Sequence, residues 1–307
     1  MTSEKNNTPT RAQACPACQT PPSTVEWGMA SPFFSGRALE KDPAPTELLR
    51  CGACGTAWAR QGLDAEQGAR LYDGYRGEAY FKQRHATEPW YTRSMNDSMG
   101  SDHEMQGRRT VFSQALKRAE LKGGLRPQGI VLDFGGDKGQ LLADLPDTTL
   151  MVSEVSGIEL CSWAKPAGDL GAWSGQCDLV MCCQVLEHVE SPASIRDKIM
   201  RLARSGGWIY LEVPNESWTQ AGAQAAWRHG WIERVSRNPK LTLALDFVST
   251  ASRLKFGVIP PFGFWSLREH MNFFTLSGLT RLAEDGGAEI LWAGLTESGL
   301  SLVGRKK

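Results

Sequence analysis

The stretch from Gly129 to Leu142 constrains the fold of this chain more than any other part of its sequence. A short apolar strand ends there near Asp133 and leads into a glycine-dense turn, then into the amphipathic start of a helix. Glycine lets the backbone approach a ligand closely or adopt a positive φ, and a helix N-terminus offers unpaired N–H groups. The layout predicts a site for a nucleotide-type cofactor, although the glycine spacing differs from the dinucleotide pattern G-x-G-x-x-G.

Further segments follow in the order that a doubly wound sheet requires. Residues 149–154 form a predicted strand that ends at Glu154, about 20 residues after the turn, where a carboxylate can accept hydrogen bonds from a ribose diol. Residues 177–183 form an apolar strand that leads into a polar turn and a helix. Residues 205–214 give a Gly-Gly turn and another strand. The pattern predicts an α/β fold around a parallel sheet.

Together these segments resemble the class I S-adenosylmethionine-dependent methyltransferases, which carry an acid-x-G-x-G-x-G turn, an acidic strand end, a "vlEHv" segment and a "GG…evP" strand in this order. The resemblance runs from about residue 129 to the C-terminus. It implies a Rossmann-like seven-stranded sheet with S-adenosylmethionine as cofactor. The residues that it assigns to the cofactor are Asp133, Gly135, Gly136, Asp137, Gly139, Glu154, Asp169, Gln184 and Glu187.

Within that set, the resemblance places the turn around the amino-acid part of the cofactor, Glu154 at the ribose and Asp169 near the adenine amine. One position departs from the family pattern, because Asp137 replaces the middle glycine of the turn. Aspartate tolerates unusual backbone angles better than most residues, so the turn can persist, and its carboxylate could engage the ammonium group of the cofactor. Purely structural roles stay open for Asp133, as a cap of the turn, and for Glu154, as a solvated strand end.

Two C-x-x-C pairs lie near the N-terminus, formed by Cys15 with Cys18 and by Cys51 with Cys54. Four thiolates presented as two such pairs make a tetrahedral zinc site. Four protein ligands leave no open position for chemistry, so the predicted zinc is structural. The alternative, a redox motif, lacks the strand–helix context that it needs.

The chain divides by pattern into three parts. Residues 1–62 are predicted to be a zinc ribbon, residues 63–125 a helical cap over the cofactor cleft, and residues 126–307 the methyltransferase domain. Residues 215–264 form an insertion in that domain, placed where the loops of an α/β sheet make the ligand crevice, and are predicted to be a substrate lid. Its tryptophans and basic residues suit a phosphorylated ligand such as a sugar nucleotide, but a helical hairpin with a solvated charged face has the same pattern.

Charge and hydropathy limit the partners. The chain has 307 residues with 34 basic and 34 acidic side chains, so no global field attracts nucleic acid or an anionic membrane, although a local basic patch stays open. The N-terminus is polar, and no apolar run approaches the length of about 20 residues that crosses a bilayer. We therefore expect a cytoplasmic protein with no membrane partner. The oligomeric state is not indicated.

Methyl transfer is an in-line displacement, so the site must align the acceptor and remove its proton. His270 lies in a segment similar to one in sugar C-methyltransferases that also carry an N-terminal zinc module, and in those enzymes this histidine is the base. Leu267 stands where they commonly have tyrosine, which disfavours carbon methylation and leaves a hydroxyl or amine acceptor open. His188 is the second candidate base. The alternative for His270 is a core histidine packed beside Phe273 and Phe274.

A catalytic metal is a further alternative at the same segment. Small-RNA ribose methyltransferases bind a divalent ion through E-x-x-E-H and a distant histidine, and here Glu187, His188 and His270 match part of that set. Gln184 replaces the first acid, and an amide is a poorer ligand for a hard cation, so the sequence disfavours a metal.

The sequence thus predicts an S-adenosylmethionine-dependent methyltransferase that acts on a small polar metabolite, with a sugar or a sugar nucleotide as the leading class. One alternative is an RNA methyltransferase that uses the zinc ribbon as its reader, but the neutral charge gives little electrostatic footprint for nucleic acid. The other is a cofactor-binding protein without catalysis, which the replacement at Asp137 would motivate.

Overall fold

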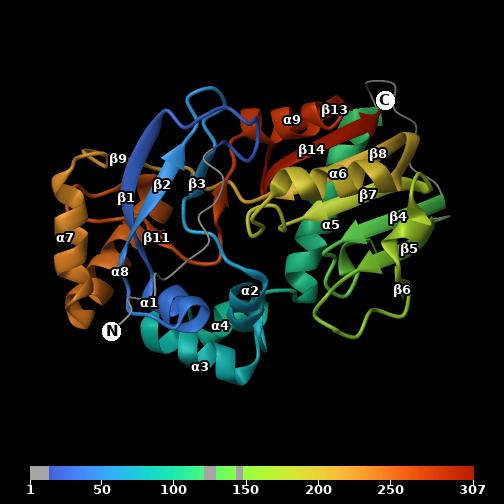
Figure 1. Cartoon of the computed structure of the whole chain (residues 1–307). Helices are drawn as coiled ribbons and strands as arrows, with labels where there is room; N and C mark the ends of the chain where they lie inside the picture. The colour runs from blue at the N-terminus through green and yellow to red at the C-terminus, as the bar shows by residue number, and fades with distance from the viewer. Residues whose placement is uncertain (1–13, 121–128, 143–147) are drawn as a thin grey trace, which may run out of the picture.

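The computed structural model describes residues 14–120, 129–142 and 148–307. Within these residues two sheets lie side by side, with the helices of the cap below them in the view of Figure 1. The larger sheet has seven strands in the order β13-β14-β8-β7-β4-β5-β6. The smaller has five, in the order β11-β1-β2-β3-β12. The seven-stranded sheet confirms the predicted α/β fold class.

Five strands of the large sheet are parallel neighbours, and the last two are added antiparallel at one edge. The strands are β4 (Gly129–Phe134), β5 (Thr148–Ser153), β6 (Ala164–Pro166), β7 (Cys177–Cys183), β8 (Ala203–Val213), β13 (Ala288–Thr296) and β14 (Gly299–Lys306). Strand order reverses between β4 and β7, because β4 continues to β5 on one side and pairs with β7 on the other. Ligands of open α/β sheets bind at such a switch point, beyond the carboxyl ends of the strands.

Helices cover both faces of this sheet, because the central strands are apolar on both sides. Leu132 and Val180 belong to the core beneath α6 (Pro192–Leu202) and α9 (Leu276–Asp285). Val131 and Leu179, one residue earlier on each strand, face the core beneath α5 (Asp102–Glu120). Because successive side chains of a strand point to opposite faces, both strands contribute to the core on each side of the sheet.

One local prediction concerns the segment after the glycine turn. The sequence pattern predicts a helix from about residue 140, and the described residues there form a 3₁₀ turn, η2 (Gln140–Leu142). Strand β5 begins at Thr148. Residues 143–147 lie outside the described part of the chain.

The small sheet joins two distant parts of the sequence. Its N-terminal strands are β1 (Thr24–Ala30), β2 (Pro45–Arg50) and β3 (Ala57–Ala59), and the excursion between β1 and β2 holds α1 (Pro32–Phe34) and η1 (Ser35–Leu39). Strand β11 (Ser266–Leu267) pairs parallel to β1, and β12 (Asn272–Phe273) pairs antiparallel to β3. The segment that carries His270 is therefore built into the sheet of the N-terminal ribbon.

The remaining elements lie outside the two larger sheets. The part predicted to be the cap contains α2 (Ala65–Tyr72), α3 (Glu78–Thr87) and α4 (Arg93–Ser98), and the loop after β6 contains η3 (Leu170–Trp173). The insertion contains α7 (Trp227–Ser236) and α8 (Pro239–Phe256), closed by the short pair β9 (Thr219–Gln220) and β10 (Val258–Ile259). Among the described helices, none is both long enough and apolar enough to span a membrane.

Candidate active site

The glycine turn after β4 has the backbone of a ligand cradle. Gly135, Asp137 and Gly139 all have positive φ, at 72°, 50° and 76°. The amide of Gly139 closes the turn by donating to the carbonyl of Gly136 at 2.8 Å. A Cβ added to Gly136 would lie 2.4 Å from Cγ of Asp133, so no larger residue fits there. The turn thus keeps bare backbone exposed to a ligand, as the residues of a cofactor site require.

Asp137 preserves the turn, since it adopts the left-handed backbone that glycine would otherwise supply. Its carboxylate Oδ2 lies 3.2 Å from Nη1 of Arg76, which belongs to the cap. The sequence left this carboxylate free to meet the ammonium group of a cofactor. In the structure it forms an ion pair between the turn and the cap.

Glu154 lies beside the same turn, directly after β5. Its Oε1 accepts hydrogen bonds from the amides of Val155 and Ser156 at 2.8 and 2.9 Å, and its Oε2 accepts one from the amide of Asp137 at 3.2 Å. These bonds hold the carboxylate in one orientation next to the turn. A fixed carboxylate at this place suits a ribose diol.

Replacing Glu154 with alanine is expected to weaken the binding of S-adenosylhomocysteine by about 1.5 to 3 kcal/mol, because charge-assisted hydrogen bonds to the ribose are lost. Titration calorimetry measures this. Glu159→Ala is the matched control, since Glu159 is an exposed acid of the same loop. Equal affinity in Glu154→Ala and in the control would remove Glu154 from the site.

The two other predicted acids differ in their surroundings. Asp133 is 2% exposed beneath the turn, and burial raises its pKa to about 7 although Arg108 opposes the shift. Asp169 is exposed in the loop after β6, where its side chain accepts the amide hydrogen of Gly171 at 2.8 Å and caps η3. The structure therefore brings Asp133 to the turn, while a contact of Asp169 with adenine stays a prediction.

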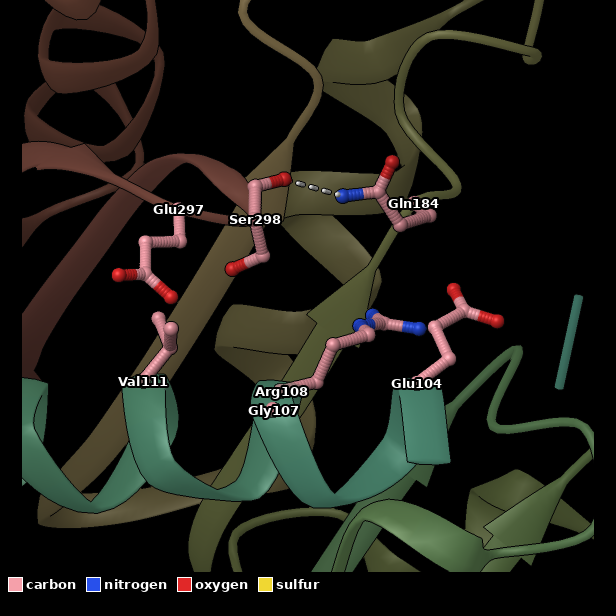
Figure 2. A pocket seen from close by; sticks show the side chains of 7 residues that line it. All are labelled: Glu104, Gly107, Arg108, Val111, Gln184, Glu297 and Ser298. Carbon is pink, nitrogen blue, oxygen red and sulfur yellow. Dashed lines mark hydrogen bonds between the residues drawn. The ribbon is translucent and has the colours of Figure 1, made fainter. Parts of the chain in front are cut away.

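A polar cavity of about 330 Å³ opens beside the end of β7 (Figure 2). Figure 2 shows side chains of α5 facing Gln184 and Ser298 across it. The lining residues are Glu104, Gly107, Arg108, Val111, Gln184, Glu297 and Ser298. Gln184 has a φ of 57° and donates its amide to the carbonyl of Ser298 at 3.4 Å.

Beneath this cavity, Glu212 of β8 is fully buried and accepts hydrogen bonds from four side chains. Arg108 donates at 2.9 Å, Tyr210 at 2.8 Å, Ser298 at 2.9 Å and Gln184 at 3.2 Å. Neither Arg108 nor Glu212 was among the site residues predicted from the sequence. An acid inside an otherwise apolar strand was the signal for Glu212, because a buried charge needs such partners.

A second cluster brings together three residues that the sequence singled out. Ligand atoms of Glu187, His188 and His270 all lie within 4.8 Å of one another, and the two imidazole rings are 4.6 Å apart between centroids. The amides of Met271 and Asn272 donate to the carbonyl of Glu187, at 2.8 and 3.0 Å. These bonds hold the β11–β12 loop against the segment that follows β7.

His188 is held through its Nδ1, which lies 2.8 Å from the hydroxyl of Tyr72 and 3.1 Å from the carbonyl oxygen of Glu269. Burial lowers the pKa of His188 to about 4, and the neighbouring charge of His270 acts in the same direction. His188 is therefore a neutral imidazole at neutral pH. With Nδ1–H donating to the carbonyl, Nε2 carries the lone pair that can accept a proton, and it lies 3.7 Å from Oε1 of Glu187.

His270 has the opposite electrostatic environment. Its Nδ1 lies 2.5 Å from Oε2 of Glu216, whose other oxygen is 3.1 Å from Nη1 of Arg253 on α8. Burial opposes the charged imidazole, but attraction to Glu216, with smaller contributions from Glu187 and Glu269, raises the pKa of His270 to about 9. His270 is thus an imidazolium at neutral pH.

Glu216 belongs to the insertion, and the sequence analysis did not identify it. Burial acts against its ionisation, yet His270 and Arg253 lower its pKa to about 2. The signal in the sequence was its position, because Glu216 comes three residues after the carboxyl end of β8, where parallel sheets bind ligands.

Glu187 completes the cluster as a carboxyl group that is 1% exposed. Neither of its side-chain oxygens has a hydrogen-bond partner among the described residues, and burial raises its pKa to about 7. Glu187, His188 and His270 could together hold a divalent cation. Gln184 stands where the small-RNA enzymes have a further acid, and its Nε2 donates to Glu212 and to the carbonyl of Ser298.

The four predicted zinc ligands also come together. Sγ of Cys15 lies 3.6 Å from that of Cys54, and Sγ of Cys18 lies 3.5 Å from that of Cys51. All four sulfurs lie within 4.8 Å of one another. A zinc tetrahedron with Zn–S bonds of about 2.3 Å needs S–S edges of about 3.8 Å, so this donor set fits the metal.

Comparisons with known proteins agree with this geometry. The family model described as "Methyltransferase domain" matches residues 102–292, well over half of the chain. The ubiquinone biosynthesis O-methyltransferase of Bordetella pertussis is 28% identical over 145 residues, which cover 46% of this chain and 55% of that protein. The protein of the same name from Nitrosomonas europaea is 42% identical over 40 residues, covering 13% and 17%. The chain spans about half the length of the first of these relatives.

Among solved structures, an O-methyltransferase family protein from Burkholderia thailandensis covers 74% of this chain and 62% of its own, with 15% identity and a TM-score of 0.37. An S-adenosylmethionine-dependent methyltransferase from Methanosarcina mazei covers 61% and 96%, with 15% identity and a TM-score of 0.34. At these TM-scores the likeness adds no support of its own. The family match and the seven-stranded sheet are sufficient: the chain belongs to the class I methyltransferases, whose cofactor is S-adenosylmethionine.

Proposed function

We propose that this protein transfers the methyl group of S-adenosylmethionine to a hydroxyl oxygen of a small polar metabolite, with a sugar or a sugar nucleotide as the acceptor class. One observation carries the proposal. A neutral imidazole, His188, and a charged imidazole, His270, face each other with ring centroids 4.6 Å apart. His188 comes three residues after Val185, which packs against Gly135 of the cofactor turn.

In this proposal His188 is the general base. It is neutral at the working pH, and the contacts of its Nδ1 with Glu269 and Tyr72 leave Nε2 to accept the hydroxyl proton. S-adenosylmethionine supplies the electrophilic methyl group when bound. Proton removal at the acceptor oxygen makes that oxygen a nucleophile for the in-line displacement.

His270 stabilises the negative charge that develops on the acceptor oxygen. Its imidazolium is kept charged by Glu216, and a preorganised cation in a partly buried site is more effective than one in water. From the sequence, His270 was predicted to be the base, with His188 as the second candidate. The electrostatic surroundings of the two rings favour the exchanged roles.

The choice of acceptor rests on three lines of support. The relatives are named O-methyltransferases, which favours an oxygen acceptor. Leu267 is buried at the position where sugar C-methyltransferases commonly have tyrosine, which disfavours a carbon acceptor. In this scheme residues 215–264 act as the substrate lid, residues 63–125 as the cap over the cofactor, and residues 1–62 as the zinc ribbon that supports the β11–β12 loop.

The test is a methyl-transfer assay with isotopically labelled S-adenosylmethionine and four acceptor classes: sugar nucleotides, free sugars, catechol-type phenols and structured RNA. We expect labelled product with a sugar or a sugar nucleotide, identified by mass spectrometry as an O-methyl compound. Product from phenols alone would contradict the sugar class but keep the hydroxyl acceptor. Product from RNA alone, or cofactor binding without turnover on any class, would overturn the proposal.

A further inference from the structure

Helix α8 of the insertion buries a polar face and exposes an apolar one. Its buried residues are the polar Thr242, Asp246 and Ser249, spaced four and three residues apart along one face. Thr242 donates to the carbonyl of Val235, and Oγ of Ser249 accepts from the amide of Phe264. A helix of a water-exposed protein normally turns its apolar stripe inward, so the inner face of α8 is unusual.

The outer face of α8 is apolar. Leu254 is 72% exposed and Phe247 52%. Leu241 and Val248 are exposed as well, and their spacing places all four side chains on the side of the helix opposite the buried polar face. These four residues extend over most of the helix, which at 18 residues is roughly 27 Å long. Such a continuous exposed stripe marks an interaction surface rather than scattered surface residues.

The same face is hollowed near the start of α8. A cavity of about 320 Å³ is lined by Pro89, Trp90, Lys240, Leu243, Ala244 and Phe247. The rings of Trp90 and Phe247 lie 5.7 Å apart between centroids. The hollow therefore combines apolar walls with one cationic group.

The two charged side chains that α8 exposes are both lysines. Lys240 lies at the start of α8, and Nζ of Lys255 lies 5.2 Å from the ring centroid of Phe256 at its end. The acid of α8, Asp246, is buried on the inner face and bonded to Arg268. Exposed apolar side chains with cations at both ends form the pattern of a helix that lies in the interface of an anionic lipid layer.

We propose that the outer face of α8 docks on an anionic lipid surface. A second copy of this chain is disfavoured, because antiparallel pairing of two α8 helices would bring Lys240 toward Lys255, and parallel pairing would oppose each lysine to its own counterpart. A lipid surface with negative headgroups satisfies both lysines and covers the full length of the apolar stripe. The net charge of the chain is zero, so its composition gives no sign of this local pair of lysines.

Docking at this face would act close to the active site. The inner face of α8 carries Arg253, which is paired with Glu216, the partner of His270. It also carries Asp246, which is paired with Arg268 two residues before His270. The helix that meets the lipid thus supports the catalytic cluster with its other face. The docking proposal stands or falls separately from the identity of the acceptor.

The test is flotation of the purified chain with vesicles of phosphatidylcholine alone and of phosphatidylcholine mixed with phosphatidylglycerol, at low and high salt. We expect binding to the mixed vesicles that weakens at high salt. Leu254→Asp and Phe247→Asp should each reduce binding at least about tenfold, since a large apolar side chain leaves the interface. Lys240→Gln and Lys255→Gln should each reduce it about fivefold.

Leu295→Asp is the matched control, because Leu295 is 62% exposed on β13, outside the proposed surface, and its loss should leave vesicle binding unchanged. Affinity for S-adenosylhomocysteine and the melting temperature report that each variant is folded. Binding to neither vesicle, or equal binding to both at low salt, would overturn the proposal. So would a dimer in analytical ultracentrifugation that Leu254→Asp dissociates, in the absence of vesicle binding, since the face would then be an interface between copies.

Discussion

His270→Asn is expected to lower kcat by about 10² to 10⁴ and to leave the affinity for S-adenosylhomocysteine nearly unchanged, because the imidazolium acts on charge that develops only in the transition state. Steady-state kinetics, with the acceptor that the methyl-transfer assay identifies, and calorimetry measure the two quantities. His85→Asn is the matched control, since His85 is an exposed histidine of α3 whose contacts, stacking on Phe81 and a bond from Nδ1 to the carbonyl of Tyr91, lie outside the catalytic cluster. If His270→Asn melts early but keeps its turnover per folded molecule, His270 is structural.

The pH profile of kcat/KM separates the two possible roles of His270. Its pKa is raised to about 9, so the charged form exists below that pH and is lost above it. If His270 acts as a cation, kcat/KM is level near neutral pH and falls above about 9. If His270 is the base, kcat/KM instead rises with pH and levels off only above about 9. We expect the first profile.

Glu216→Gln tests whether His270 causes the fall in kcat/KM at high pH. Glutamine keeps the size and a hydrogen bond but removes the carboxylate that raises the pKa of His270. The fall in kcat/KM should therefore move from about 9 toward the ordinary histidine pKa of about 6.5. If the pH at which kcat/KM falls is the same in Glu216→Gln as in the parent, a titrating group other than His270 causes the fall.

Cys51→Ser is expected to lower the affinity for zinc at least about 100-fold and to unfold the N-terminal ribbon, because metal binding supplies folding free energy to so small a unit. Elemental analysis of protein purified without chelators should give one zinc per chain in the parent and less in the variant. Cys161→Ser is the control, since Cys161 lies outside the cluster. A parent protein without zinc would contradict the prediction.

The structure adds a consequence that the cysteine spacing does not predict. Strand β12 pairs with β3 through Asn272 with Trp58 and Phe273 with Ala57, and Thr275 donates to the carbonyl of Cys54. Loss of zinc should therefore disturb the loop that carries His270. We expect turnover to fall by at least tenfold in Cys51→Ser while S-adenosylhomocysteine still binds to the turn after β4. Full turnover in a zinc-free variant would show that the ribbon does not support the loop that carries His270.

The sequence determined the features that depend on local pattern. The apolar run that becomes β4, the glycines of the turn and the acid at the end of β5 predicted the cofactor side of the site, because steric freedom and strand period are properties of short segments. The two C-x-x-C pairs predicted the sulfur cluster, because the spacing within each pair is also a property of a short segment. Asp137 was the informative exception, since an aspartate that tolerates positive φ preserves the turn.

The tertiary structure decided the features that depend on contacts between distant segments. The sequence offered His188 and His270 as alternative bases, but only the fold placed Glu216 2.5 Å from His270, which keeps that ring charged, and buried His188 beside the charged ring, which keeps His188 neutral. The reversed face of α8 was likewise hidden, because burial of Asp246 depends on Arg268. Spacing along the chain specifies strands and turns, whereas charge states and exposed faces depend on which distant groups the fold brings together.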